Sequence, residues 1–179
     1  VAVRIGDHRP AERPRLERHH RQALEVGRHH KRRRSGEDVK LVAVVDDADW
    51  DLVGRVDGKP IKTYRISLGK GAKKGPKLIE GDKRTPEGFY WIDWRKTSDK
   101  FNLSMHISYP NISDSARARR EGVEPGGMIM IHGTPDSEET PEDLFHTLDW
   151  TDGCVAMRNV DMREVWNLVP DGTMVEIRP

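Results

Sequence analysis

The sequence predicts a mainly β domain, built as a β-sandwich or barrel with a few short helices and preceded by a basic N-terminal tail. Short runs rich in β-branched and aromatic residues begin at Val39 and are separated by turn residues, whereas helical patterns are few. Residues 1–38 have almost no apolar periodicity and carry 11 Lys and Arg against six Asp and Glu. We therefore predict a disordered tail over 1–38 and one folded domain over 39–179.

Each predicted element has its own local signal. The first strands lie within 39–71, and Asp57-Gly58 between two of them is typical of a type I′ hairpin, whose two central residues need positive φ. Short apolar or alternating runs predict further strands at 88–94, 103–109, 128–132 and 173–178. Helices are predicted at 113–121, 141–148 and 160–168. Asn159 is the predicted N-cap of the last helix, because its side chain can accept from an unpaired backbone N–H.

Composition excludes several function classes. The formal net charge is +1, and the tail alone contributes +5, so composition gives no case for nucleic-acid binding by the whole molecule. No stretch reaches the roughly 18 apolar residues of a membrane span, and no secretory signal is visible at the N-terminus. With one cysteine, the chain has neither an internal disulfide nor a four-cysteine zinc site.

The tail contains two histidine pairs and one run of basic residues. His19/His20 and His29/His30 are candidate metal ligands, and the run at 31–34 is a candidate phosphate contact. No acidic or cysteine partner surrounds these histidines, so a solvated tail is the favoured interpretation. A nucleic-acid arm is the alternative for this segment.

The single cysteine, Cys154, lies in an unusual place for a structural thiol. A buried cysteine normally sits within an apolar strand or helix, whereas Cys154 follows the turn-like run Thr151-Asp152-Gly153. A glycine before a nucleophile lets the backbone turn sharply, so that successive N–H groups converge on a developing oxyanion. The pattern favours a nucleophile exposed beside its own donors, with a packed structural cysteine as the alternative.

A cysteine nucleophile with an ordinary pKa of about 8.5 needs a base or a positive field to form a thiolate at neutral pH. Three histidines of the folded part are candidates for that base: His106, His132 and His146. His132 ends an apolar strand and precedes Gly133, which places its imidazole at a sheet edge over a loop. His106 lies within a strand and His146 in a predicted surface helix. Strand ends deliver residues to clefts, so His132 is the preferred base, with a histidine that merely hydrogen-bonds the loop as the alternative.

Two segments, IMIHGT at 129–134 and DWTDGCVAMRN at 149–159, together resemble the L,D-transpeptidase catalytic domain, also called the YkuD domain. The family signature is a His-Gly pair, a variable loop, and then Ser or Thr, any residue, Gly and Cys. The resemblance covers roughly 39–178 in the family's order, through YRISLGKG at 64–71, GDKRTPEGFYWI at 81–92 and VPDGTMVEI at 169–177. The motifs are specific jointly, although each alone is weak.

This resemblance implies a β-rich fold with the cysteine in a cleft, acting on peptidoglycan stem peptides. The bond attacked joins the third residue, commonly diaminopimelate, to the terminal D-alanine of a tetrapeptide. The resemblance implies Cys154 as nucleophile and His132 as the base that takes its proton and later returns it to the leaving amine. Gly133 matches the position whose carbonyl orients the imidazole ring.

The resemblance also implies an oxyanion hole made by the N–H groups around Asp152, Gly153 and Cys154. We group Thr151 and His106 with these residues as oxyanion or substrate-binding candidates. A thioester splits one acyl exchange into two easier steps, with an amine acceptor giving transpeptidation and water giving carboxypeptidation. We expect no metal and no organic cofactor.

The match departs from the family at Ala156. Many members have Arg at this place, two residues after the cysteine, where it is thought to hold a substrate carboxylate or brace the site; Met157 and Asn159 do fit. Arg158 projects differently and is not given that role. Some members with this variation resemble enzymes that detach protein or peptide from peptidoglycan. Hydrolysis is therefore kept beside transpeptidation, and a non-catalytic peptidoglycan-binding module is the alternative from another class.

Two further expectations concern the cellular location of the protein and the loop before the cysteine. The resemblance implies work in the cell envelope or periplasm, although this sequence contains no visible export signal. The stretch between His132 and Cys154 is long and acidic, and it is either a lid or an exposed insertion.

Overall fold

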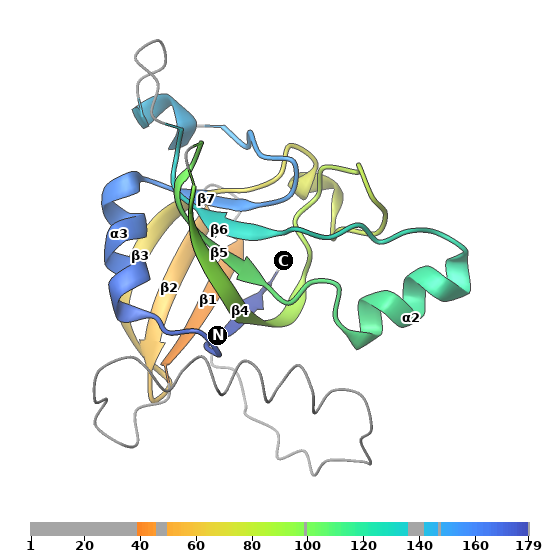
Figure 1. The fold of residues 1–179 in the computed structure, drawn as a ribbon, viewed down its shortest axis with the longest axis horizontal. Coiled ribbons are helices and arrows are strands. Elements are labelled where there is room, and N and C mark those ends of the chain that lie inside the picture. Colours follow the sequence, from red (N-terminus) through yellow and green to blue (C-terminus); the bar gives the residue numbers. More distant parts are fainter. Residues whose placement is uncertain (1–38, 46–49, 99, 136–141, 147, 179) are drawn as a thin grey trace.

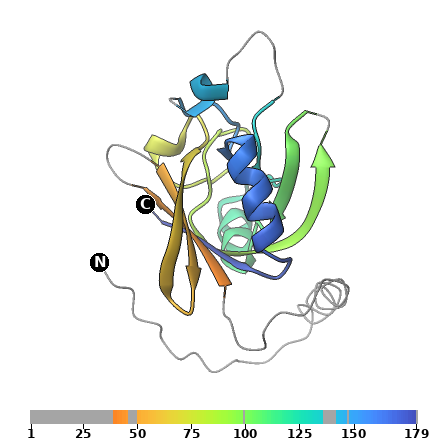
Figure 2. The ribbon, with the colours of Figure 1, turned by 90° about the vertical axis from the view of Figure 1, so that its left-hand side faces the viewer.

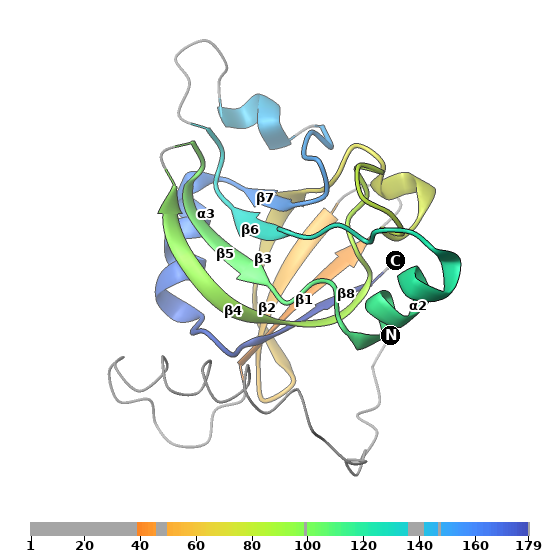
Figure 3. The same ribbon diagram turned by 45° about the vertical axis from the view of Figure 1, so that its right-hand side comes forward.

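The computed structural model describes residues 39–45, 50–98, 100–135, 142–146 and 148–178. Within these ranges, eight strands close into one barrel accompanied by two α-helices and two short 3₁₀ helices (Figures 1 and 3). The mainly β fold predicted from the sequence is therefore confirmed. The predicted basic tail at 1–38 lies outside the described residues.

Neighbouring strands in the closed barrel follow the order β1-β2-β3-β7-β6-β5-β4-β8. The strands are β1 (Val39–Val45), β2 (Trp50–Val56), β3 (Lys59–Ser67), β4 (Gly88–Ser98), β5 (Asn102–Ile107), β6 (Met130–His132), β7 (Val155–Met157) and β8 (Met174–Ile177). Strands β1 and β8 are parallel, as are β6 and β7, and the other neighbours are antiparallel. The β6–β7 pair brings the segment after the single cysteine beside the strand that ends at His132.

The β2–β3 hairpin turns at Asp57 and Gly58, whose φ angles are 48° and 75°. Both angles are positive, as a type I′ turn requires, so the predicted hairpin is confirmed. Strand β3 then runs to Ser67, where it pairs with Ala156 of β7. The hairpin thus connects the first strands to the part of the barrel that carries the cysteine.

Apolar side chains that alternate along the strands fill the barrel interior. The buried cluster contains Leu41, Ala43, Leu52, Tyr64, Ile66, Tyr90, Ile92, Met105, Ile107, Ile131, Val155, Met157, Val175 and Ile177. Helix α3 (Asn159–Leu168) packs against β5 and adds Met162 and Val165 to this cluster. Figure 2 shows the helix between the β2–β3 and β4–β5 hairpins. The alternate residues of β5, β6 and β7 therefore face outward, away from this core.

The two helices begin differently from each other. Helix α2 (Ile112–Glu121) starts with Asn111 as its N-cap, which forms a capping box with Asp114. The predicted N-cap of α3 is wrong, because Arg158 occupies that position and has no side-chain cap hydrogen bond. Asn159 is instead the first helical residue. Its side chain is engaged elsewhere, with the backbone of Thr134.

Other boundaries also differ from the sequence prediction. The strand predicted at 128–132 is shorter, because Met128 has a φ of 57° and does not extend it. Within the helix predicted at 141–148, the described residues form the 3₁₀ helix η3 (Glu142–His146), and Leu148 is not helical. Strand β7 was not predicted, since three residues are too few for a periodic pattern. In the described part of the chain, no helix has both the length and the apolar character to cross a membrane.

Candidate active site

The end of β6 and the start of β7 place His132 and Cys154 on one face of the sheet. His132 pairs with Ala156, and Ile131 pairs with Val155, in parallel register. Side chains alternate along a strand, and Ile131 and Val155 face the core. His132, Ala156 and Cys154 are each one residue away from one of these, so they lie on the other face of the sheet. A strand spacing of about 4.8 Å and a rise of about 3.3 Å per residue put the Cα atoms of His132 and Cys154 roughly 8 Å apart. Cys154, which immediately precedes β7, thus lies near the end of β6 that carries His132.

His132 is buried and held in one ring orientation. The residue is 3% exposed, and its Nδ1 atom lies 2.6 Å from the carbonyl oxygen of Gly133. Burial lowers the pKa of His132 to about 4, and the Gly133 carbonyl opposes only part of that shift. A carbonyl oxygen can only accept, so the neutral ring carries its proton on Nδ1 and the lone pair on Nε2. The free nitrogen is thus the one that can act as a base.

The surroundings of His132 differ from the sequence prediction. The imidazole was expected at a sheet edge over a loop, but β6 lies between β5 and β7, within the sheet. The rings of Phe101 and Trp150 lie 4.5 and 5.7 Å from the imidazole, measured between centroids. These two aromatics come from the β4–β5 hairpin and from the segment after η3. No local pattern in the sequence marks them as neighbours of His132.

The Cys154 thiol is partly enclosed. Its Sγ atom lies 3.4 Å from the backbone nitrogen of Met130 and 3.8 Å from the carbonyl oxygen of Met128. Burial raises the pKa of the thiol, while the Met130 N–H and the Lys77 charge act in the opposite direction. The resting pair is therefore a neutral thiol beside a neutral imidazole. Proton transfer between them is what forms a thiolate.

The Thr151 hydroxyl holds the turn before the cysteine. It donates to the carbonyl oxygen of Cys154 at 2.7 Å and accepts from the N–H of Gly153 at 3.2 Å. Gly153 has a φ of +128°, and a Cβ there would lie 2.7 Å from the carbonyl oxygen of Arg84, so glycine is required. The Asp152 side chain is exposed. Of the three N–H groups predicted for the oxyanion hole, that of Gly153 already has Thr151 as its acceptor.

Gly133 and Asn159 fix the chain beyond the histidine. The Asn159 amide accepts from the N–H of Thr134 at 3.1 Å and donates to its carbonyl oxygen at 3.2 Å. A Cβ on Gly133 would lie 2.1 Å from Oδ1 of Asn159 and 3.0 Å from the carbonyl oxygen of Phe101. Close approach therefore requires glycine here. The sequence did not reveal this role of Asn159, because the contact joins residues 25 positions apart.

His106 belongs to a separate group of side chains on the same face. It pairs with Met130 across β5 and β6, and its Nδ1 atom lies 2.6 Å from Oδ1 of Asp93. The ring stacks on Trp94 at a centroid distance of 4.8 Å. Strand β6 lies between β5, which carries His106, and β7, which follows Cys154. The described contacts of the His106 ring are with Asp93 and Trp94, and its role in substrate binding stays a prediction.

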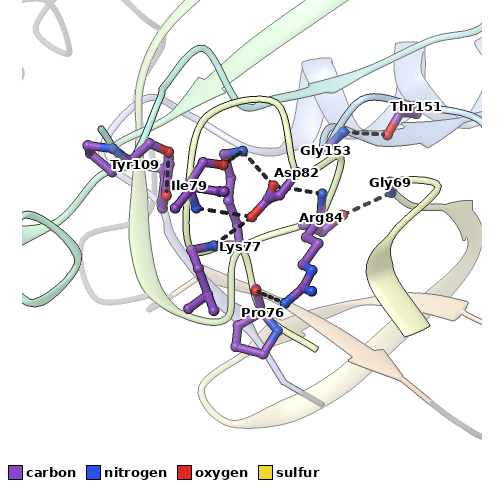
Figure 4. A network of polar contacts seen from close by, with 12 residues as sticks. Gly69, Pro76, Lys77, Ile79, Asp82, Arg84, Tyr109, Thr151 and Gly153 are labelled. Carbon is purple, nitrogen blue, oxygen red and sulfur yellow. Dashed lines mark hydrogen bonds and ion pairs between the residues drawn. The ribbon is translucent and has the colours of Figure 1, made fainter. Parts of the chain in front are cut away.

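A loop beneath the nucleophile turn is tied together by a buried carboxylate (Figure 4). Oδ1 of Asp82 lies 2.9 Å from Nζ of Lys77 and accepts from the N–H of Arg84 at 3.0 Å. Oδ2 accepts from the N–H groups of Leu78 and Ile79 at 2.7 and 3.1 Å. Burial acts to raise the pKa of Asp82, but these hydrogen bonds outweigh it and lower that pKa to about 2. Sequence reasoning identified this segment only by its resemblance to a family motif.

Six of the predicted site residues lie either in the turn just before β7 or at the end of the neighbouring strand β6: Thr151, Asp152, Gly153, Cys154, His132 and Gly133. No group of three or more His, Cys, Asp or Glu side chains in the described ranges is placed to hold a metal ion. The arrangement offers a thiol, a neighbouring base with a free nitrogen and a turn of backbone N–H groups. These are the components that thiol-dependent acyl transfer requires.

A family model named YkuD, the L,D-transpeptidase catalytic domain, matches residues 41–177. The match includes both segments of the site, the strand that ends at His132 and the turn that carries Cys154. The chain belongs to the YkuD family. The resemblance seen in the sequence motifs is therefore confirmed.

Similar proteins agree with this membership. A curated relative named "Putative L,D-transpeptidase YafK" from Escherichia coli is 27% identical over 148 residues, which cover 80% of this chain and 52% of the relative. The chain thus spans about half the length of that YkuD relative.

Solved structures share the YkuD fold of this chain. The helical cell shape determining protein Pgp2 of Campylobacter jejuni has a TM-score of 0.56 at 23% identity, over 89% of this chain and 55% of Pgp2. An L,D-transpeptidase of Mycobacterium tuberculosis has a TM-score of 0.52 at 15% identity, over 80% of this chain and 59% of that protein. At these identities the likeness concerns the fold.

Proposed function

We propose that this YkuD domain is a cysteine L,D-transpeptidase that acts on the tetrapeptide stems of peptidoglycan through a thioester. The observation that carries the proposal is the position of Cys154 immediately before β7, two residues from Ala156, which pairs with His132 of the parallel strand β6, with Nδ1 of the histidine held by Gly133. This pairing supports a thiol activated by a base, because the second ring nitrogen is left to accept a proton. Family membership supports the substrate class.

The first half-reaction forms the acyl-enzyme. Nε2 of His132 takes the proton of the Cys154 thiol, and the sulfur attacks the carbonyl carbon of the third stem residue. The backbone N–H groups of Asp152 and Cys154 stabilise the oxyanion, since that of Gly153 donates to the Thr151 hydroxyl. The carbon–nitrogen bond then breaks, the imidazolium gives its proton to the departing D-alanine amine, and a thioester remains on the sulfur.

The second half-reaction returns the free enzyme. An acceptor amine attacks the thioester carbonyl and passes a proton to His132, which has become neutral again in the first half-reaction. The carbon–sulfur bond breaks, a new amide forms, and the imidazolium returns its proton to Cys154. Because burial keeps the imidazole neutral at ordinary pH, the same ring serves as base in both halves.

Hydrolysis of the same acyl-enzyme is the second candidate, and Ala156 favours it. This residue is fully buried and pairs with His132, so the position two residues after the sulfur supplies no charge to hold an acceptor. Water then competes with an amine for the thioester. The products of that route are a tripeptide stem and free D-alanine, or a peptide or protein released from peptidoglycan.

Product analysis with defined muropeptides tests the proposal. Wild-type protein and the Cys154→Ala variant are incubated with tetrapeptide muropeptides, and the products are separated by mass. Cross-linked dimers indicate transfer, and tripeptides with free D-alanine indicate hydrolysis. A non-catalytic binding module would bind sacculi equally well with and without the thiol and would turn over nothing. We expect the reaction to take place in the cell envelope, where peptidoglycan lies.

A further inference from the structure

A strongly basic loop lies next to the nucleophile turn. Residues 69–85 contain six Lys and Arg and two Asp and Glu, a net charge of +4 in a chain whose total is +1. Lys70, Lys73, Lys74 and Lys83 of this loop are exposed. The loop contains the 3₁₀ helix η2 (Ala72–Lys74), in which no residue is buried. Positive charge is therefore concentrated on one segment.

Backbone contacts fix this loop against the turn that precedes the cysteine. The N–H of Lys70 donates to the carbonyl oxygen of Thr151 at 3.0 Å, and the N–H of Gly71 donates to that of Lys83 at 2.8 Å. A Cβ on Gly69 would lie 2.3 Å from the carbonyl oxygen of Lys83 and 3.0 Å from the Cα atom of Gly153. Figure 4 shows Gly69, Arg84, Thr151 and Gly153 in this one region. The backbone of Lys70 thus lies against the turn before the cysteine, and that of Lys83 lies against Gly69 and Gly71.

Little acidic charge offsets these exposed lysines. The Lys70 ammonium lies 3.7 Å from Asp152 Oδ1, in a pair whose side chains are 53% and 76% exposed, and such pairs are weak. Lys83 forms no ion pair within the described part of the chain. The one buried carboxylate of the loop, Asp82, is already held by Lys77. The ammonium groups of Lys70 and Lys83 are therefore available to an anionic ligand.

We infer that Lys70 and Lys83 bind a free carboxylate of the donor peptide next to the bond that breaks. The inference rests on the proposed function, in which the donor is a stem peptide ending in a carboxylate one residue beyond the scissile bond. In this chain Ala156 supplies no charge near the sulfur, so the basic loop is the nearby source of exposed positive charge. These lysines determine specificity and do not take part in the chemical steps.

The test compares three donor peptides that differ in one carboxylate. The first is a tetrapeptide with all carboxylates free, the second has the terminal D-alanine as its amide, and the third has the side-chain carboxylate of the third residue as its amide. Each is assayed with wild type, with Lys70→Gln/Lys83→Gln and with Lys59→Gln. Lys59 is an exposed lysine at the far end of β3, about 26 Å along the strand from Ser67, and it serves as the matched control.

We expect the double variant to raise the KM for the free donor about tenfold with kcat within twofold, because a lost charge-assisted contact weakens binding by about that factor. One of the two amidated donors should show the same loss with wild type and no further loss with the double variant, which identifies the carboxylate. The effect should shrink at high salt, and Lys59→Gln should behave as wild type.

Two failures are distinguishable. If wild type turns over the donors and the double variant has an unchanged KM for all three, the lysines do not bind the substrate and the inference is wrong. If wild type turns over no donor, the proposed function is wrong. Calorimetry then measures how the free and amidated donors bind to Cys154→Ala, and to the same variant with Lys70→Gln/Lys83→Gln added. This comparison still decides whether the loop selects the carboxylate. If the two proteins bind all three donors with equal affinity, the inference is overturned.

Discussion

Nδ1 of His132 lies 2.6 Å from the carbonyl oxygen of Gly133, so the residue that follows the histidine sets the orientation of its ring. The same contact decides which nitrogen carries the proton, because the carbonyl oxygen cannot donate. Nε2 is left as the basic atom on a ring that is 3% exposed. The first two predictions follow from the burial of this ring, and the third from the glycine beside it.

The pH dependence of activity should reflect the lowered pKa of His132. Protonation removes the base, and burial moves that event from a pH of about 6.5 down to about 4. We therefore expect kcat/KM for a tetrapeptide donor to fall on the acid side with a midpoint near pH 4. The measurement is a pH–rate profile between pH 3.5 and 8, with a parallel check that the protein stays folded. An acid limb centred at pH 6.5 would contradict the buried, neutral imidazole.

Folding stability should also depend on His132. Because folding lowers its pKa from 6.5 to about 4, the unfolded chain binds the proton first as the pH falls. The stability that this group provides is complete above pH 6.5 and is lost as the pH falls to 4, by on the order of 3 kcal/mol. Urea unfolding of wild type and His132→Gln across this range measures it. The free energy of wild type should fall more steeply than that of the variant, and parallel curves would refute the prediction.

Gly133→Ala should destabilise the protein by about 2 kcal/mol or more, because its Cβ would overlap Oδ1 of Asn159 at 2.1 Å. Moving Asn159 also disturbs the loop after His132, so activity should fall together with stability. Gly127→Ala is the matched control, since a Cβ there meets nothing within 4 Å. Urea unfolding and donor turnover are measured on both. Equal stabilities of the two variants would show that the close approach is unimportant.

Lys77→Met should be strongly destabilising, by about 3–5 kcal/mol, because it leaves the buried carboxylate of Asp82 without its ammonium partner. The Lys77 and Asp82 side chains are only 4% and 8% exposed. Lys62→Met removes an exposed partner of Glu164 and should change unfolding little. The comparison is made by urea unfolding at pH 7. If the two variants lose equal stability, the Asp82 cluster does not hold the loop.

The sequence was informative wherever the signal was local. Two positive φ angles at Asp57 and Gly58 were predictable from the residue types, and short apolar or alternating runs marked β4 and β5. The turn at Gly153-Cys154 and the strand that ends at His132 were also recognisable from local sequence. The sequence did not predict that the sheet closes into a barrel, because its short strands fitted either a sandwich or a barrel.

What the sequence missed depends on contacts between distant segments. Asn159 carries a residue type suited to an N-cap, yet its amide is used by Thr134 and Arg158 takes the cap position. The covering of His132 by Phe101 and Trp150 joins three separate parts of the chain. Only folding reveals such contacts, so the burial that lowers the pKa of His132 could not be predicted from its neighbours in sequence.

The most direct test of the account is the intact mass of the protein during turnover of a tetrapeptide donor, after rapid acid quenching. In wild type, the account predicts an adduct on Cys154 whose mass equals that of the donor minus D-alanine. It predicts no adduct in Cys154→Ala and a strongly reduced rate of adduct formation in His132→Gln. An adduct of the same mass in Cys154→Ala, or folded wild type that neither acquires an adduct nor releases D-alanine, would contradict the account.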